Sequence, residues 1–370
     1  MEVYIHDTHI ISPLGFGTSE NFEAVVSGRT ALAPVFINNS IGSVYAASIN
    51  DTVFDRYFED LDATFKGSRI EKLMIAALKP VISKNKIKEN TVLVLSTTKG
   101  NIKALEKNNL ESALITELAL HINNYFGFKT EPIVVSNACV SGVMALSVAK
   151  RFIETGGFSD AYVVAADELT PFVISGFQSF QAMSGEPCRP YDMNRSGVNL
   201  GEAAAAAYVS PEKRPDAVLM AGEAHINDAN HISGPSRTGE GLLLSIEKAF
   251  KEAAISADEI DYISAHGTAT LFNDEMEAIA FHRAGVQQAP LNSFKGYFGH
   301  TLGASGLLET ILAAESLKNN TLVASLGYES PGTTQPLNII AKPEKTPLKT
   351  VLKTASGFGG SNSALVLIKN

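Results

Sequence analysis

The residue best placed to do chemistry in this sequence is Cys139, in the stretch EPIVVSNACVSGVMALSVAKRFIETGG at residues 131–157. Residues 133–135 predict a short buried strand, and apolar residues at helical spacing after Cys139 predict a helix that stops near Gly156. Cys139 would then lie at the N-terminus of that helix, where free N–H groups and the helix dipole lower a thiol pKa from about 8.5. Such a cysteine can act as a nucleophile, and the alternative is a buried structural cysteine.

Three stretches in the second half carry further reactive groups. Residues 264–270 (SAHGTAT) contain His266, residues 295–306 (KGYFGHTLGASG) contain Lys295 and His300, and residues 356–362 (SGFGGSN) surround Phe358 with glycines. A histidine at a strand end is typical of a group that faces a cavity, and glycines let the backbone approach a ligand closely.

Each of these stretches also has a structural interpretation. Single histidines are often hydrogen-bonded core residues, a loop lysine is often solvated, and clustered glycines often form a hairpin turn. The glycine spacing matches neither a phosphate-binding loop nor a dinucleotide fingerprint, and the histidines and cysteines lack the spacing of a metal site.

Composition limits the class of protein. The chain has 370 residues, 45% of them hydrophobic, a net charge of −9 and two cysteines. A negative charge argues against binding to nucleic acid or to anionic membranes, and two cysteines fit a reducing compartment without a disulfide framework. The first residues lack the pattern of a signal peptide and no run of about 18 apolar residues occurs, so we expect a soluble cytoplasmic protein.

Strands and helices alternate along the chain, which predicts an α/β fold. The charged segment SPEKRP at 210–215 predicts a boundary between two similarly built halves, residues 1–210 and 211–370, with a site at their junction. A weak repeat of strand, small-residue turn and helix at 133–155 and 291–317 supports this division. Strands are expected at 3–11, 44–49, 91–96, 161–166, 202–209, 217–221, 260–264, 350–354 and 363–368, and helices at 19–27, 68–83, 110–126, 239–254, 274–283 and 303–317.

Taken together and in order, the motifs NACVSG, HGTAT, KGYFGHTLGASG and GFGGSN resemble a β-ketoacyl-acyl-carrier-protein synthase of the thiolase superfamily. The stretches ISPLG and RPYDMNRSGVNLGE lie in the order of that family as well, so the resemblance covers essentially the whole chain. It implies a thiolase-like fold in an αβαβα layered arrangement. It also implies an acyltransferase, a 3-oxoacyl-[acyl-carrier-protein] synthase that condenses an acyl-cysteine with malonyl carrier protein in fatty acid or polyketide biosynthesis.

The resemblance implies a role for each reactive residue. Cys139 matches the cysteine that carries the acyl group as a thioester. His266 and His300 match the histidines that hold the malonyl thioester carbonyl and assist loss of CO₂. Lys295 matches the lysine that orders this network, and Glu277 an acidic residue that helps to hold the lysine and its loop.

Further positions match the pocket around the nucleophile. Phe358 matches an aromatic gate whose backbone N–H forms an oxyanion hole with that of Cys139. Thr268 and Thr270 match hydroxyls that contact the phosphopantetheine arm of the carrier protein. The chemistry agrees, since the condensation needs a nucleophile that stores an acyl group and donors that stabilise an enolate without repelling it.

Two other functions compete with this interpretation. A non-catalytic partner subunit that sets chain length for another synthase usually lacks the nucleophile, whereas Cys139 is present here. A coenzyme-A thiolase uses a second cysteine near the end of the chain, and Cys188 lies in the wrong place for that role. Several departures from the family pattern, including Leu271 and Phe272, favour a specialised enzyme that makes polyene or aryl-primed chains.

The expected partner is an acidic acyl carrier protein, and no cofactor is expected. Because the chain is itself acidic, docking needs a local basic patch, for which Lys66, Arg69 and Lys72 are candidates; a solvated charged face is the alternative. The family implies a homodimer, or a heterodimer with a chain-length factor. Residues 100–131 are shorter than is usual in the family, so the length of the product is not predicted.

Overall fold

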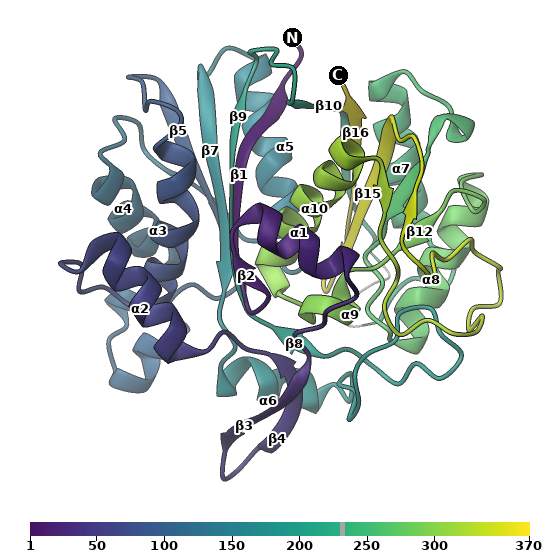
Figure 1. Ribbon diagram of the computed structural model, residues 1–370, viewed down its shortest axis with the longest axis horizontal. Coiled ribbons are helices and arrows are strands. Elements are labelled where there is room, and N and C mark those ends of the chain that lie inside the picture. The colour runs from purple at the N-terminus through teal and green to yellow at the C-terminus, as the bar shows by residue number, and fades with distance from the viewer. Residues whose placement is uncertain (230–233) are drawn as a thin grey trace.

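The computed structural model describes residues 1–229 and 234–370. Within them, one sheet runs through both halves of the chain in the order β12-β11-β15-β16-β10-β1-β9-β7-β5-β6, with β2 paired to β1 (Figure 1). Its strands are β1 (Tyr4–Ser12), β2 (Gly15–Phe16), β5 (Thr91–Ser96), β6 (Ile133–Val135), β7 (Asp160–Asp167), β9 (Ala203–Ser210), β10 (Val218–Asn227), β11 (Tyr262–Ser264), β12 (Leu291–Asn292), β15 (Thr350–Gly357) and β16 (Ser361–Lys369).

Smaller strands and the helices complete the fold. Strands β3 (Ala33–Asn38), β4 (Gly42–Ala47) and β8 (Leu200–Gly201) form a second sheet, and β13 (Thr321–Leu322) pairs with β14 (Glu344–Lys345). The helices are α1 (Thr18–Val26), α2 (Asp51–Asp62), α3 (Arg69–Ile82), α4 (Ile115–Phe126), α5 (Ser141–Glu154), α6 (Pro171–Ser179), α7 (Glu240–Ala253), α8 (Leu271–Arg283), α9 (Lys295–Phe298) and α10 (Ser305–Asn319). Among the described residues, no helix is both long and apolar enough to cross a lipid bilayer.

The main sheet has two parts that join where β1 pairs with β10. Helices α5 and α10 pack between the two parts, α3 and α4 cover the outer face of the first, and α7 and α8 cover the outer face of the second. Strand β5 shows how this layering arises, since Val92 and Val94 face the central helices whereas Leu93 and Leu95 face α3 and α4. The resulting order is the predicted αβαβα.

The two central helices meet through glycines. A Cβ atom at Gly142 of α5 would lie 2.4 Å from the Leu307 nitrogen, and one at Gly306 of α10 would lie 2.6 Å from the Val143 nitrogen. Because the neighbouring atoms are backbone, neither position has room for a larger residue. This close approach brings the N-terminal ends of α5 and α10 together, and Cys139 and His300 both lie just before those ends.

Some elements differ from the sequence-based expectations. The predicted helix at 110–126 is only α4, because the 3₁₀ turns Ile102–Lys107 and Glu111–Ala113 precede it. Helix α3, by contrast, agrees with the helix predicted at 68–83 and continues through Pro80 to Ile82. Helix α2 was not predicted, since its apolar stripe is narrow: only Phe54 and Phe58 are buried. The β3–β4 hairpin was predicted only as a strand at 44–49.

Candidate active site

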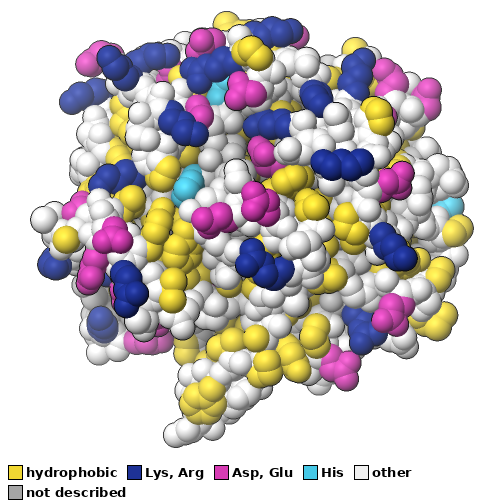
Figure 2. All heavy atoms as spheres, viewed as in Figure 1, with side chains coloured by type: hydrophobic (Ala, Val, Ile, Leu, Met, Phe, Trp, Pro, Cys, Tyr) yellow, Lys and Arg dark blue, Asp and Glu magenta, His cyan; other side chains and the backbone are white. Residues whose placement is uncertain are grey.

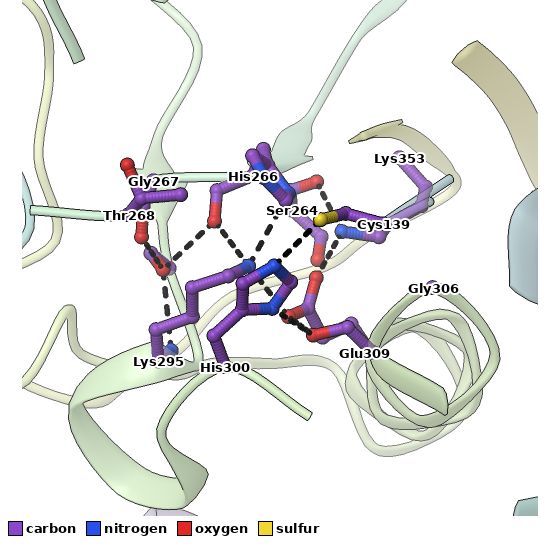
Figure 3. Close-up of polar contacts among 12 residues, drawn as sticks. Cys139, Ser264, His266, Gly267, Thr268, Lys295, His300, Gly306, Glu309 and Lys353 are labelled. Carbon is purple, nitrogen blue, oxygen red and sulfur yellow. Dashed lines mark hydrogen bonds and ion pairs between the residues drawn. The ribbon is translucent and has the colours of Figure 1, made fainter. Parts of the chain in front are cut away.

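Cys139, His266 and His300 come from separate segments and meet in one place (Figure 3). The Cys139 Sγ lies 2.9 Å from His300 Nε2, and the rings of His266 and His300 are 5.3 Å apart and nearly perpendicular. Cys139 follows β6, His266 follows β11, and Lys295 and His300 follow β12. In α/β sheets the groups after the carboxyl ends of strands gather at one edge, and that placement accounts for the convergence. The predicted proximity of the three groups is confirmed.

A tight turn presents Cys139 to this centre. Ala138 has a φ of 44°, in the left-handed region that non-glycine residues rarely adopt. The Ser141 hydroxyl accepts from the Asn137 N–H at 2.7 Å and donates to the Ala138 carbonyl at 2.6 Å, which holds the turn. A Cβ at Gly357 would lie 3.1 Å from the Cys139 nitrogen, so the segment after β15 also presses against the turn.

The thiol is more weakly acidic than its position before a helix suggests. Burial raises the pKa of Cys139 to about 11, and Lys295 and a hydrogen bond from the Phe358 backbone lower it only in part. The expectation of a lowered pKa was wrong, because the desolvation of a fully buried sulfur outweighs the helix terminus. A thiol of this kind needs a base to accept its proton, and His300 Nε2 is the nitrogen in contact with it.

A second correction concerns the carboxylate that holds Lys295. The Lys295 ammonium donates to Glu309 Oε1 at 2.9 Å, and also contacts the His266 carbonyl at 2.5 Å and His266 Nδ1 at 3.3 Å. Glu277 instead accepts the backbone N–H groups of His266 at 2.9 Å and of Gly267 at 2.7 Å. Glu277 therefore holds the histidine loop, as expected, but the lysine is paired with Glu309.

Glu309 also fixes the proton positions on the two histidines. Burial alone would raise the pKa of Glu309, but Lys295 and Lys353 lower it to about 2, so the group is an ionised acceptor. The Ser305 hydroxyl donates to Glu309 at 2.9 Å and lies 3.3 Å from His300 Nδ1. With its only hydrogen on Glu309, Ser305 can only accept from His300, which places the His300 hydrogen on Nδ1 and leaves Nε2 as an acceptor.

The proton on His266 follows from the same reasoning. An ammonium only donates, so His266 Nδ1 accepts from Lys295 and His266 Nε2 carries the hydrogen. Burial lowers the pKa of His300 to about 3, with a further lowering by Lys295, so this ring is neutral near pH 7. One neutral histidine is thus arranged as a donor and the other as a base.

A cavity of about 400 Å³ opens onto these groups. Thr268 and Thr270 line it and their hydroxyls are 2.9 Å apart. The Phe358 ring stacks on Phe177 with centroids 5.8 Å apart and contacts Phe180 at 5.2 Å. The lining is otherwise mainly small or apolar and includes Ala182, Val198, Leu271 and Phe272.

The predicted docking residues are not a free basic patch. Arg69 makes two hydrogen bonds of 2.9 Å to Glu202 and one to Asp51, and its side chain is only 18% exposed. Lys72 pairs with Asp55 at 3.3 Å, whereas Lys66 is exposed. Figure 2 shows basic and acidic side chains interspersed over the face it draws. Arg69 therefore stabilises the fold through these ion pairs, and the docking role of the three residues stays a prediction.

Sequence reasoning missed Ser305, Glu309, Lys353 and Phe177. Glu309 and Lys353 carried a signal, because each is a lone charge within an apolar run, LLETILAA and TVLKTA. A charge in a fully buried helix or strand needs a partner, so two such residues of opposite sign predict a contact. Ser305 and Phe177 carried no signal of this kind.

Comparisons with known proteins agree with the geometry. Residues 82–214 match the family model "Beta-ketoacyl synthase, N-terminal domain" and residues 217–329 match "Beta-ketoacyl synthase, C-terminal domain". The chain is 27% identical to 3-oxoacyl-[acyl-carrier-protein] synthase 2 of Coxiella burnetii, over 99% of this chain and 98% of that protein. It is 33% identical to the tetracenomycin polyketide synthase ketoacyl synthase alpha subunit of Streptomyces glaucescens, over 64% and 59% of the two chains.

The fold has a close structural counterpart. A chain from the structure of the ketosynthase ApeO in complex with its chain length factor ApeC, from Xenorhabdus doucetiae, matches with a TM-score of 0.87 and 23% identity. The match covers 99% of this chain and 98% of that one. It confirms the thiolase-like fold predicted from the motifs.

Proposed function

The chain belongs to the beta-ketoacyl synthase family and is a condensing acyltransferase, a 3-oxoacyl-[acyl-carrier-protein] synthase; from that premise we propose how its residues divide the reaction. Cys139 is the nucleophile, His300 its base and His266 the donor to the malonyl thioester. The observation that carries this assignment is the 2.9 Å contact between Cys139 Sγ and His300 Nε2, with His266 beside them.

In the first step the acyl group moves from the carrier protein to Cys139. The thiol proton passes to His300 Nε2 as sulfur attacks the acyl carbonyl, and the same proton leaves with the thiol of the phosphopantetheine arm. The Phe358 and Cys139 backbone N–H groups stabilise the oxyanion that forms on that carbonyl. Since the buried His300 stays neutral at rest, it is ready to accept a proton at neutral pH.

In the second step malonyl carrier protein enters and loses CO₂. The electrons of the broken carbon–carbon bond form an enolate, whose oxygen accepts a hydrogen bond from His266 Nε2–H. The enolate carbon then attacks the acyl-Cys139 carbonyl, the carbon–sulfur bond breaks, and uptake of one proton restores the thiol.

Substrate and partner follow from the same site. Thr268 and Thr270 hydrogen-bond the phosphopantetheine arm where it enters the cavity, and Lys66 and Lys72 remain the residues offered to an acidic carrier protein. We infer that the chain acts as a dimer, either with a second copy or with a chain-length factor, because ApeO is solved with such a partner. The apolar lining suits a polyene or aryl-primed acyl chain.

The non-catalytic partner subunit remains the competing function. Such a subunit has no need of a nucleophile in contact with a base, and this chain has both. The two functions differ in one measurable property, which is covalent loading of Cys139.

Intact-mass analysis after incubation with a panel of acyl-carrier-protein thioesters tests the proposal. We expect the mass to increase by one acyl group, with loss of the label in Cys139→Ala, and a 3-oxoacyl product once malonyl carrier protein is added. A wild-type chain that takes up no acyl group from any member of the panel would refute the enzyme and favour the partner subunit. Preference for ordinary saturated primers would refute the specialised substrate alone.

A further inference from the structure

Two lysines that are completely shielded from solvent share one carboxylate beside the catalytic histidines. Lys295 and Lys353 are each 0% exposed, and Lys353 lies in β15, outside every motif that identified the family. The Lys353 ammonium donates to Glu309 Oε2 at 2.5 Å and to the Ser264 carbonyl at 3.3 Å, while Lys295 occupies Oε1 (Figure 3). Glu309 is thus held at both oxygens by different lysines.

Charge neutrality does not account for Lys353. Lys295 and Glu309 already form a balanced pair, so a second buried ammonium leaves the group of three with a charge of +1. A buried cation loses several kcal/mol of hydration, and apolar residues often replace buried ion pairs without loss of stability. Burial lowers the pKa of Lys353, and Glu309 opposes that change most strongly, as the carboxylate that accepts a hydrogen bond from the ammonium.

Contacts lead from Lys353 to both histidines. Glu309 Oε1 accepts from Lys295, which contacts His266 Nδ1 and the His266 carbonyl. The same oxygen accepts from Ser305, which lies against His300 Nδ1. A carboxylate free to turn about its terminal torsion would lose one of these bonds, and an ammonium on Oε2 opposes that turn.

We propose that Lys353 is a positioning residue for the condensation: by holding Glu309 Oε2, it keeps Oε1 on Lys295 and Ser305 and so fixes the orientation of His266 and His300. Lys353 touches neither the sulfur nor the cavity, and the chain of contacts from it to the two histidines runs through Glu309. This inference rests on the proposed function, since it concerns the same two histidines.

Lys353→Met tests the proposal, with Lys150→Met as a matched control. Lys150 of α5 is also a buried lysine, 3% exposed in its side chain, and pairs with Glu252 at 2.5 Å and Glu154 at 2.8 Å. It has no contact with the catalytic histidines, so its substitution reports what the loss of a buried ion pair does to the fold alone. Lys353→Gln keeps a donor for Glu309 and serves if the methionine variant does not fold.

The expected result is a fall in kcat of condensation without a change in KM. Removal of a residue that orients catalytic groups commonly costs about 10- to 100-fold in activity, and we expect a fall in that range for Lys353→Met. Lys353→Gln should fall less, and Lys150→Met should stay within about threefold of the wild type. In a Glu309→Gln background, Lys353→Met should change kcat by less than about threefold, because its route to the histidines is already cut.

Three results would overturn the proposal. These are a kcat for both Lys353 variants equal to that of Lys150→Met, an effect confined to KM, or an undiminished effect in the Glu309→Gln background. The proposed function fails separately, if the wild-type chain itself neither loads Cys139 nor condenses. A wild type that condenses together with unaffected Lys353 variants would remove only this inference.

Discussion

The two halves of the chain repeat one local design and fill it with different chemistry. In the first, strand β6, a tight turn and helix α5 present Cys139, and the turn is held by a serine hydroxyl and backbone groups. In the second, strand β12, a short helix and helix α10 present His300, and the support is ionic, from Lys295, Glu309 and Lys353. The groups that hold the Cys139 turn are uncharged, whereas the groups that support His300 include three buried charges.

This difference explains why neither unit can act alone. The thiol keeps its proton, because burial raises the Cys139 pKa. The charged unit supplies a neutral imidazole with a fixed tautomer, which is the group that the thiol needs. The glycine contact between α5 and α10 brings the two together, so each unit completes the other.

Loss of the nucleophile should have the largest effect, because it abolishes the chemistry of the first unit and leaves that of the second. We expect Cys139→Ala to lower the condensation rate by on the order of 10⁴-fold or more, since no covalent intermediate can form. Decarboxylation of malonyl carrier protein should persist, because His266 and its network remain intact. Product formation and CO₂ release, measured on the same samples, check this.

Cys188→Ala is the matched control for that experiment. Cys188 is the other buried free cysteine and donates to the Lys295 carbonyl at 3.3 Å, but it lies outside the contact between sulfur and imidazole. The Cys188→Ala enzyme should therefore keep at least a substantial part of the wild-type condensation rate. A Cys139→Ala enzyme that still formed the 3-oxoacyl product would refute the assignment of the nucleophile.

Loss of the base should produce the next largest effect and a change in pH dependence. We expect His300→Ala to slow loading of Cys139 by about 10²- to 10⁴-fold. Without a base, loading depends on thiolate formed directly, and the thiol pKa of about 11 means that this fraction grows as pH rises. Residual loading should therefore increase by roughly tenfold per pH unit between about pH 7 and 9.

The wild type should behave differently over the same range. The pKa of His300 is lowered to about 3, so the imidazole is neutral and competent throughout it, and loading should be nearly independent of pH. Rates of acyl transfer from a carrier-protein thioester, followed by intact mass, give both profiles. Parallel profiles for the two enzymes would show that His300 is not the base.

The same contrast marks what the sequence could and could not predict. Motifs with unusual residues, such as the histidine in HGTAT and the cysteine in NACVSG, identified the reacting groups and the family. The alternation of strands and helices predicted the layers. The sequence did not reveal that burial would dominate the Cys139 pKa, because desolvation depends on how completely the surrounding elements close over the sulfur.

The sequence also did not reveal which charged residues far apart along the chain form ion pairs. The match of Glu277 to a residue near Lys295 was correct for the loop and wrong for the ion pair, because several acidic residues lie within reach in the sequence and only packing selects one. Arg69 was read as a surface charge for a similar reason. Its partner Glu202 lies 133 residues later in the sequence, so the two side chains come together only when the chain is folded.

Substitutions at the glycine contact test how much the close approach of α5 and α10 contributes to stability. Gly142→Ala and Gly306→Ala each place a methyl group against backbone atoms of the opposite helix, so we expect each to lower the free energy of unfolding by about 1–3 kcal/mol. Because both act on one contact, the double variant should lose less than the sum. Thermal and urea unfolding measure these changes.

Gly176→Ala provides the control for the glycine variants. Gly176 lies in helix α6 and a Cβ there would meet no atom within 4 Å, so alanine should be neutral or slightly stabilising. Additive losses in the double variant would indicate that the two glycines serve separate contacts, contrary to the close approach of α5 and α10.

The smallest expected effect concerns the access of acyl groups to Cys139. Phe180, at the end of α6, is 55% exposed and contacts the Phe358 ring, whereas Phe172 of the same helix is 58% exposed and, among the described residues, has no ring contact with Phe358. An aromatic pair contributes about 0.5–1.5 kcal/mol, so Phe180→Ala should raise the population of a displaced Phe358 ring by about 2- to 12-fold. Loading of Cys139 by bulky acyl groups should become faster by up to that factor. Decarboxylation should be unchanged, and Phe172→Ala should load like the wild type.

Equal loading rates for the Phe180→Ala and Phe172→Ala enzymes would show that Phe180 does not restrain Phe358. Slower loading in Phe180→Ala would show that Phe180 helps to bind the acyl chain instead.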